Sequence, residues 1–164
     1  MIKSMSDSGI GAGRRTPEVL LVDDSLGCIL LAEEAFEAAR TPIRLSVAGS
    51  GEEALGRLRR EGEFRDHPRP DLVLLDRNLP RMDGQSVLQA IRSDPSLHSL
   101  PVVMMSGSSA VDDISDSYAA GANAYIVKPG GYERLTEIVE AIRLFWFEAA
   151  SLPIPVAQGK AHAA

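Results

Sequence analysis

Two adjacent carboxylates, Asp23 and Asp24, follow an apolar run near the N-terminus of the sequence. Three further apolar runs lead to Asp76, to Ser106 and to Lys128. Carboxylates are typical ligands of a hard divalent cation, and a carboxylate facing an ammonium and a hydroxyl group has the parts for phosphoryl transfer. The residue types therefore indicate a metal-assisted phosphoryl chemistry, provided that the fold brings the ends of these runs together.

Three gathered carboxylates repel one another, at a cost of about 4 kcal/mol for a pair ~4 Å apart at an effective dielectric constant of 20. A hard divalent cation removes that repulsion, and oxygen ligands from carboxylates, a carbonyl group and water are typical of Mg²⁺. In such a site Asp76 would attack phosphorus, Mg²⁺ and Lys128 would neutralise the developing charge, and Ser106 would hydrogen-bond one phosphoryl oxygen. The plainer alternative makes the acids helix caps paired with Lys128, but capping accounts for one acid per helix and not for two adjacent ones.

Short apolar runs alternate with amphipathic segments along the chain. The predicted strands are Glu18–Val22, Arg44–Ala48, Asp71–Leu75, Pro101–Met105 and Ala124–Val127. The first helix is framed by Leu26, Ile29, Leu30, Glu33 and Phe36, the second opens with a capping box at Ser50 and Glu53, and the others span about 84–93, 111–120 and 132–147.

Five strand–helix units in this order predict right-handed crossovers and an α/β fold with a doubly wound, five-stranded parallel sheet and five helices. The flavodoxin-like strand order 2-1-3-4-5 places ligands beyond the carboxyl ends of the strands, where strands 1 and 3 meet. Asp23, Asp24, Asp76, Ser106 and Lys128 all fall at that edge.

Length and composition limit the other possibilities. The 164 residues suit one domain over 17–150, with flexible tails at 1–16 and 151–164. A net charge of −6 argues against nucleic-acid binding, and no apolar run is long enough to span a membrane. The single cysteine and the lack of a signal-peptide pattern favour a cytoplasmic location.

Four segments together resemble the receiver domain of two-component response regulators. They are "LLVDDS" (20–25), "DLVLLDRNLPRMDG" (71–84), "PVVMMSGS" (101–108) and "GANAYIVKP" (121–129). The resemblance covers about 18–147.

This resemblance implies that Asp76 is the phosphoacceptor and that Lys128 contacts the phosphoryl group. It further implies Asp24 as a direct Mg²⁺ ligand, Asp23 as a ligand largely through water, and the Asn78 backbone carbonyl as the remaining protein ligand. Ser106 and Tyr125 would form the conformational switch pair, and Pro129 would follow a cis peptide bond.

Two features depart from the family pattern. Arg77 stands where an apolar residue is commoner, and Gly130–Gly131 leave the loop before the last helix unusually free. Neither is expected to touch the chemistry. A narrower resemblance, carried by segments 61–84 and 112–129 and by the terminal "LFW", is to small stand-alone regulators paired with bacterial phytochrome histidine kinases, which implies a kinase that responds to red light.

Two rival functions remain open at this point. An aspartate-nucleophile phosphatase of the haloacid-dehalogenase type also pairs an aspartate with Mg²⁺, but it normally has two acids spaced by one residue after the first strand. Here Asp23 and Asp24 are contiguous, and Asp76 is followed two residues later by Asn78. The other rival is a degenerate receiver that serves only as a scaffold.

The last helix ends in three consecutive aromatics, Phe145, Trp146 and Phe147. Neighbours on a helix are about 100° apart, so the three cannot all face one core. We expect at least one to be exposed or covered by a partner, and we predict a homodimer through the face made by helix 4, strand 5 and helix 5. The alternative is that residues after Ser151 fold back over the aromatics.

Overall fold

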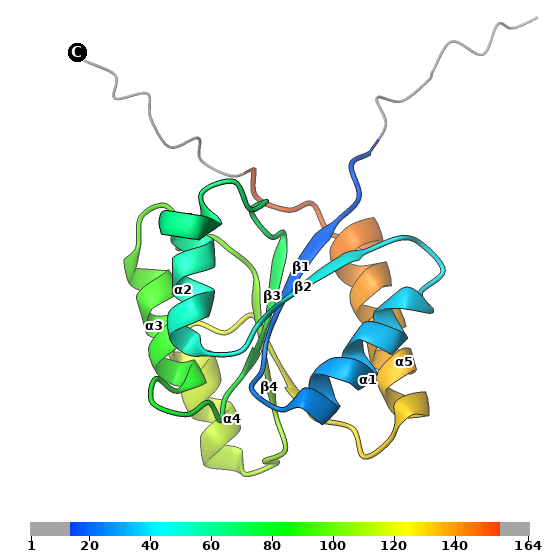
Figure 1. Cartoon of the computed structure of the whole chain (residues 1–164). Coiled ribbons are helices and arrows are strands. Elements are labelled where there is room, and N and C mark those ends of the chain that lie inside the picture. The colour runs from blue at the N-terminus through cyan, green and yellow to red at the C-terminus, as the bar shows by residue number, and fades with distance from the viewer. Residues whose placement is uncertain (1–13, 155–164) are drawn as a thin grey trace, which may run out of the picture.

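The computed structural model describes residues 14–154 and contains one five-stranded parallel sheet in the order β2-β1-β3-β4-β5 (Figure 1). The strands are β1 (Glu18–Val22), β2 (Arg44–Ala48), β3 (Leu72–Asp76), β4 (Val102–Ser106) and β5 (Ala124–Val127). The helices are α1 (Leu26–Glu37), α2 (Gly51–Arg59), α3 (Gly84–Ser93), α4 (Val111–Ala119) and α5 (Tyr132–Ile142), with a short 3₁₀ turn, η1, at Gly62–Phe64. The predicted α/β fold and strand order are confirmed. The strands β3 and β4 each begin and end one residue later than predicted.

The three central strands, β1, β3 and β4, are buried along their whole length, as expected for a parallel sheet covered on both faces. Alternate residues of these strands point into two separate cores. One core packs against α2 and α3, and the other against α1 and α5, which lie together on the opposite face (Figure 1). The edge strands β2 and β5 are less buried.

Side-chain caps fix where three helices begin. Ser25 accepts a hydrogen bond from the Cys28 N–H at the start of α1, and Asp83 accepts one from the Ser86 N–H at the start of α3. Ser50 caps α2 as predicted, but the Glu53 carboxylate returns to the Gly49 N–H rather than to the N-cap residue.

The predicted apolar face of α1 was wrong at two positions, Leu26 and Leu30. Leu26 and Leu30 are 69% and 54% exposed, whereas Ala32, Ala35 and Phe36 are buried. The side of α1 that carries Leu26 and Leu30 faces solvent, and the helix packs on the sheet through Ile29, Ala32 and Phe36.

The last helix changes its winding near its end. α5 runs to Ile142 and continues as a π-helix, η2, over Arg143–Ala149. Trp146 and Phe147 pack partly into the core, while Phe145 stays 56% exposed. The expectation that at least one aromatic remains exposed is therefore confirmed.

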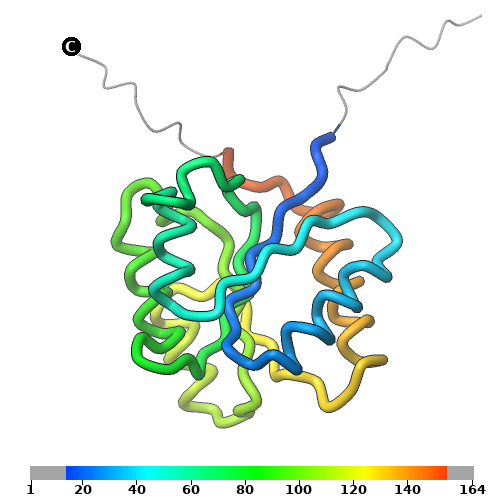
Figure 2. Tube along the Cα trace, in the orientation of Figure 1, coloured from blue at the N-terminus to red at the C-terminus, as the bar shows by residue number. Residues whose placement is uncertain are grey.

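Both described ends of the chain lie at the edge of the sheet opposite the carboxyl ends of the strands (Figures 1 and 2). Residues 14–16 and 151–154 carry no helix or strand, and the rest of the expected tails, 1–13 and 155–164, falls outside the described residues. Pro153 and Ile154 border a hollow with Arg69 and Pro101, away from the aromatics of η2. The described part of the C-terminal segment leaves Phe145 56% exposed.

Candidate functional site

Three carboxylates meet at the carboxyl ends of β1 and β3. Asp23, Asp24 and Asp76 each have a carboxylate oxygen within 4.8 Å of the other two. Asp23 and Asp76 are buried, at 2% and 5% exposure, while Asp24 faces solvent. Adjacent parallel strands end at one edge, which is why residues more than fifty positions apart in sequence gather here.

Lys128, which follows β5, bridges the two buried acids. Its Nζ lies 2.9 Å from Asp23 Oδ2 and 2.9 Å from Asp76 Oδ2. One ammonium group offsets one of the three negative charges, so the cluster keeps an excess of negative charge that suits a divalent cation.

Burial and hydrogen bonding act in opposite directions on the ionisation of this cluster. Burial raises the pKa of the Asp76 carboxyl above its ordinary value of 3.8, although the hydrogen bonds from the Asn78 N–H and Lys128 oppose this change. The pKa of Lys128 is also raised, because the hydrogen bonds and charges of Asp23 and Asp76 outweigh the desolvation that would lower it. Lys128 is thus held in its charged form.

The polar groups around Asp24 differ from those around Asp23. Asp23 Oδ1 accepts from the Ser25 N–H and Oδ2 from Lys128, so both of its oxygens have protein partners. Within residues 14–154 no protein group donates a hydrogen bond to the Asp24 carboxylate, whose oxygens remain free to bind a cation.

Asn78 connects the acid cluster to Ser106. Its backbone N–H donates to Asp76 Oδ1 at 2.9 Å, and its side-chain Nδ2 donates to Ser106 Oγ at 3.3 Å. Ser106 is fully buried at the end of β4. The sequence marked only the backbone carbonyl of Asn78, so the hydrogen bond from its side chain to Ser106 is an addition from the structure.

A close approach behind Asp76 requires glycine at position 84. A Cβ on Gly84 would lie 2.2 Å from the Asp76 carbonyl oxygen and 2.8 Å from Arg77 Cα. The start of α3 therefore presses directly on the backbone of the β3–α3 turn and fixes the position of Asp76.

Comparison with known proteins identifies the family. Residues 19–140 match the response regulator receiver domain. Response regulator Rcp1 of Synechocystis sp. is 36% identical over 82% of this chain and 92% of its own length. The crystal structure of phosphorylated RcpA, a cyanobacterial phytochrome response regulator, is 41% identical, covers 85% of this chain and 100% of that one, and superposes with a TM-score of 0.80. RPA3017, a response regulator in red light signalling of R. palustris, is 34% identical over 84% of this chain and 99% of its own, also with a TM-score of 0.80.

The chain belongs to the response regulator receiver domain family.

The receiver family leaves the haloacid-dehalogenase alternative without support. The matches to these response regulators cover nearly the whole length of each relative. A divalent metal at the acid cluster agrees with the chemistry of its donors, and Rcp1 has a structure in a Mn²⁺-bound form. No helix in the described part of the receiver is long and apolar enough to cross a membrane.

Tyr125 lies on β5 and is connected to Ser106 through the β4–α4 loop. Its hydroxyl donates to the Ser108 carbonyl oxygen at 2.8 Å, and the Ser108 N–H donates to Ser106 Oγ at 3.1 Å. The two predicted switch residues are therefore joined through Ser108, which the sequence did not single out.

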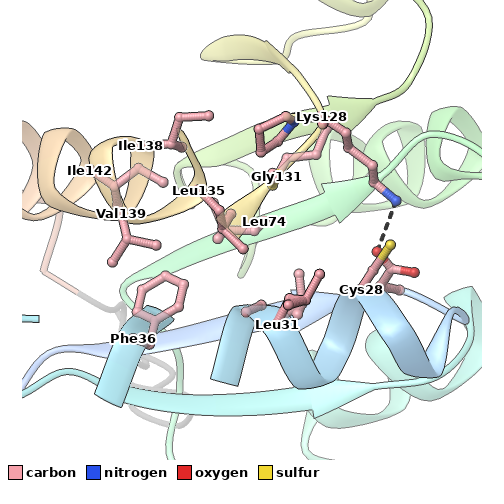
Figure 3. A pocket seen from close by; sticks show the side chains of 16 residues that line it. Cys28, Leu31, Phe36, Leu74, Lys128, Gly131, Leu135, Ile138, Val139 and Ile142 are labelled. Atoms are coloured by element: carbon pink, nitrogen blue, oxygen red, sulfur yellow. Dashed lines mark hydrogen bonds and ion pairs between the residues drawn. The ribbon is translucent and has the colours of Figure 1, made fainter. Parts of the chain in front are cut away.

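An apolar cavity of about 120 Å³ lies between α1 and α5, directly beside the ion pair of Lys128 with Asp23 (Figure 3). Leu31, Leu135 and Ile138 line it together with Gly130 and Gly131. Lys128 is thus fixed at its ammonium end, while the loop that follows it borders empty space.

The peptide bond before Pro129 is trans, so the expected cis bond was wrong: no cis peptide occurs within residues 14–154. The two isomers of a bond before proline differ by only about 0.5–1 kcal/mol, so the local sequence does not decide between them.

Proposed function

We propose that the protein is a response regulator that accepts a phosphoryl group on Asp76 from a sensor histidine kinase. The observation that carries the proposal is the pairing of Lys128 with Asp23 and Asp76 in one acid cluster at the carboxyl edge of the sheet. Its only reactions are phosphoryl transfer to Asp76 and hydrolysis of that group; it does not turn over a separate substrate.

The transfer step forms one bond and breaks one. An Asp76 carboxylate oxygen attacks the phosphorus of a phosphohistidine, the O–P bond forms, and the N–P bond breaks with its electron pair passing to the imidazole nitrogen. Lys128, already 2.9 Å from Asp76 Oδ2, stabilises negative charge on the phosphoryl oxygens.

Asp24, Asp23, Asp76 and the Asn78 carbonyl are the residues that would hold Mg²⁺. When bound, Mg²⁺ supplies positive charge to the phosphoryl oxygens during transfer. The free oxygens of Asp24 support a direct bond to the metal, whereas both oxygens of Asp23 already have protein partners, which supports a role through water. This donor set contains only oxygen, as Mg²⁺ prefers.

Phosphorylation of Asp76 would change the surface made by α4, β5 and α5. A phosphoryl group attracts the Ser106 hydroxyl, and this movement replaces the hydrogen bond from the Ser108 N–H. Because Tyr125 is bonded to the carbonyl of the same Ser108, the loop and the tyrosine ring move together.

A phytochrome histidine kinase is the proposed phosphoryl donor, in the cytoplasm. The support is the similarity to RcpA, a cyanobacterial phytochrome response regulator, and to RPA3017 of red light signalling. The exposed Leu26 and Leu30, at the same edge as Asp24, offer an apolar surface for the kinase next to the phosphoacceptor.

A homodimer through α4, β5 and α5 forms part of the proposal. β5 is an edge strand, and a groove between it and α5 is lined by Ile126, Ile138 and Trp146. Phe145 packs edge-on against Trp146, with ring centroids 5.0 Å apart, and leaves more than half of its own surface uncovered. A second copy related by a two-fold axis would cover this apolar surface without any other partner.

Phe145→Asp is expected to shift the protein from dimer to monomer in sedimentation velocity, because it places a charge in the proposed interface. Phe147, which packs into the core, is unsuitable for this test. The control is Leu30→Asp, which changes an apolar residue of similar exposure on α1 and should leave the dimer intact. A wild-type protein that sediments as a monomer both with and without phosphorylation would contradict the dimer.

The function itself is tested by incubating the full chain with acetyl phosphate and Mg²⁺ and measuring its intact mass. We expect one added phosphoryl group, lost again on standing and absent when Mg²⁺ is chelated. Continuous release of phosphate from small phosphomonoesters without a labelled protein would favour the phosphatase, and the absence of any labelling would favour the scaffold.

A further inference from the structure

α4 is held to the rest of the domain mainly by polar contacts. Ser117 is its only buried residue, and its first residue, Val111, is 76% exposed. Near its end, the Tyr118 hydroxyl accepts from the Tyr125 N–H at 3.2 Å, and Gln85 Nε2 donates to the Asp116 carbonyl oxygen at 2.8 Å. With so little apolar burial, the position of α4 depends on these polar contacts.

An ion pair to α4 comes from Arg77, the residue that follows the phosphoacceptor. An Arg77 guanidinium nitrogen lies 3.1 Å from Asp113 Oδ1 in the first turn of α4. The two side chains are only 22% and 28% exposed, so this ion pair is less screened by water than an ordinary surface pair.

Asp113 also fixes the β4–α4 loop. Its second oxygen, Oδ2, accepts a hydrogen bond from the Ser108 hydroxyl at 2.5 Å. Ser108 is the residue whose N–H donates to Ser106 and whose carbonyl accepts from Tyr125. One connected set of contacts therefore runs from Arg77 through Asp113 and Ser108 to both switch residues.

Two buried side-chain atoms lack a hydrogen-bond partner within residues 14–154, Arg77 Nε and Gln85 Oε1. Both belong to side chains that reach from the sheet or α3 to α4. Buried polar atoms without partners disfavour the arrangement that buries them.

We infer that Arg77 is a positioning residue that holds α4 and the β4–α4 loop in the unphosphorylated arrangement, through Asp113 and Ser108. This inference rests on the proposed function, since the arrangement it opposes is the one that phosphorylation of Asp76 favours. For the Ser106 hydroxyl to turn toward the phosphoryl group, Ser108 must move, and Ser108 is tied to Arg77 through Asp113. Arg77 thereby sets how much of the phosphorylation free energy is needed to move α4.

The first test needs no ligand. Amide hydrogen exchange of the unphosphorylated full chain is compared for wild type, Arg77→Leu, Asp113→Asn and the double variant. We expect exchange in the β4–α4 loop and α4 to speed up roughly three- to tenfold in each variant, while α2 and α5 stay unchanged. Because both substitutions break the same contact, the double variant should exchange no faster than the faster single variant.

The second test measures coupling to the site. The same proteins are titrated, with Mg²⁺ present, with beryllofluoride, a tetrahedral mimic of a phosphoryl group, while amide NMR signals of α4 are followed. Removing a contact made only in the resting arrangement should tighten beryllofluoride binding by about three- to tenfold. Arg77→Lys, which keeps the charge, should lie between wild type and Arg77→Leu.

Arg59→Leu is the matched control, because Arg59, the last residue of α2, pairs with Asp94 at the end of α3 and not with α4. It should leave both measurements at the wild-type value. Exchange that speeds up evenly over all helices, or faster exchange in α4 with unchanged beryllofluoride affinity, would overturn the inference. A wild-type protein that binds no beryllofluoride would contradict the proposed function instead, and the exchange comparison would still decide whether Arg77 holds α4.

Discussion

Asp76→Asn is expected to lower phosphorylation by acetyl phosphate, or by a cognate kinase, by on the order of a hundredfold or more. An amide has no anionic oxygen to attack phosphorus, and no other carboxylate ends β3. The variant should fold normally, because its Oδ1 can still accept from the Asn78 N–H as the carboxylate does. Intact mass and radiolabelling measure the effect.

The same substitution should raise thermal stability at pH 7 in the absence of metal. The pKa of Asp76 is raised in the folded protein by burial, so the folded state favours the protonated form more than the unfolded state does. Because of the raised pKa, Asp76 favours the folded state most at low pH, where its carboxyl is protonated. That contribution to the free energy of unfolding is lost as pH rises through the folded-state pKa, so at neutral pH the charged carboxylate opposes folding. Asparagine removes that charge, and its advantage should vanish as pH falls below the ordinary value of 3.8.

Asp71→Asn is the matched control for both effects. Asp71 stands at the other end of the same strand, where it accepts hydrogen bonds from Arg15 and from the Glu18 N–H. Its replacement should leave phosphorylation intact and should lower stability rather than raise it. If Asp76→Asn is labelled as well as the wild type, Asp76 is not the acceptor, and the label must be sought on Asp23 or Asp24.

The arrangement of the site was predictable because it depends on chain order and strand direction. Asp23, Asp76, Ser106 and Lys128 each follow an apolar run, and the carboxyl ends of parallel strands share one edge of the sheet. The burial of β1, β3 and β4 was predictable for the same reason, since nearly continuous apolar runs require cover on both faces.

The features that sequence did not predict depend on where an element lies in three dimensions. Leu26 and Leu30 have the spacing of a buried helical face, yet α1 packs on the sheet through Ile29, Ala32 and Phe36 and leaves them exposed. Phe145, Trp146 and Phe147 have nearly the same apolar character, and only the winding of η2 decides which one faces solvent. Periodicity describes the faces of a helix but not the surface that each face meets.

The ion pair of Arg77 was not predicted for a related reason. In sequence it is a departure from an apolar position beside Asp76, with no sign of a partner. Its partner, Asp113, is one of two adjacent aspartates in the first turn of α4, and the pairing depends on how α4 lies against β3. An unusual residue next to an acceptor, together with an acidic first turn in a later helix, is a pattern that could suggest such a contact elsewhere.

Mg²⁺ is expected to stabilise the folded protein. Three carboxylates share one ammonium group in this cluster, and a cation that binds only the folded arrangement raises the free energy of unfolding by linkage. At ten times its dissociation constant the gain is about 1.4 kcal/mol, which corresponds to a rise in the melting temperature of roughly 3–6 °C for a domain of this size. Ca²⁺ and Mn²⁺ titrations alongside Mg²⁺ would compare the divalent cations at the same oxygen ligands.

Asp24→Ala should remove most of this metal-dependent shift while leaving the metal-free protein close to wild type in stability. Asp24 is exposed, and within residues 14–154 its carboxylate accepts no hydrogen bond, so replacing it with alanine costs the fold little. Asp23 is buried and hydrogen-bonded to Lys128, so its replacement would also damage the metal-free structure. Asp66→Ala, another exposed aspartate on the α2–β3 connection, is the matched control and should keep the full shift. A wild-type melting temperature that does not move at millimolar Mg²⁺ would show that the acid cluster is not the metal site, whereas a shift that survives Asp24→Ala would transfer the direct ligand role to Asp23 and Asp76.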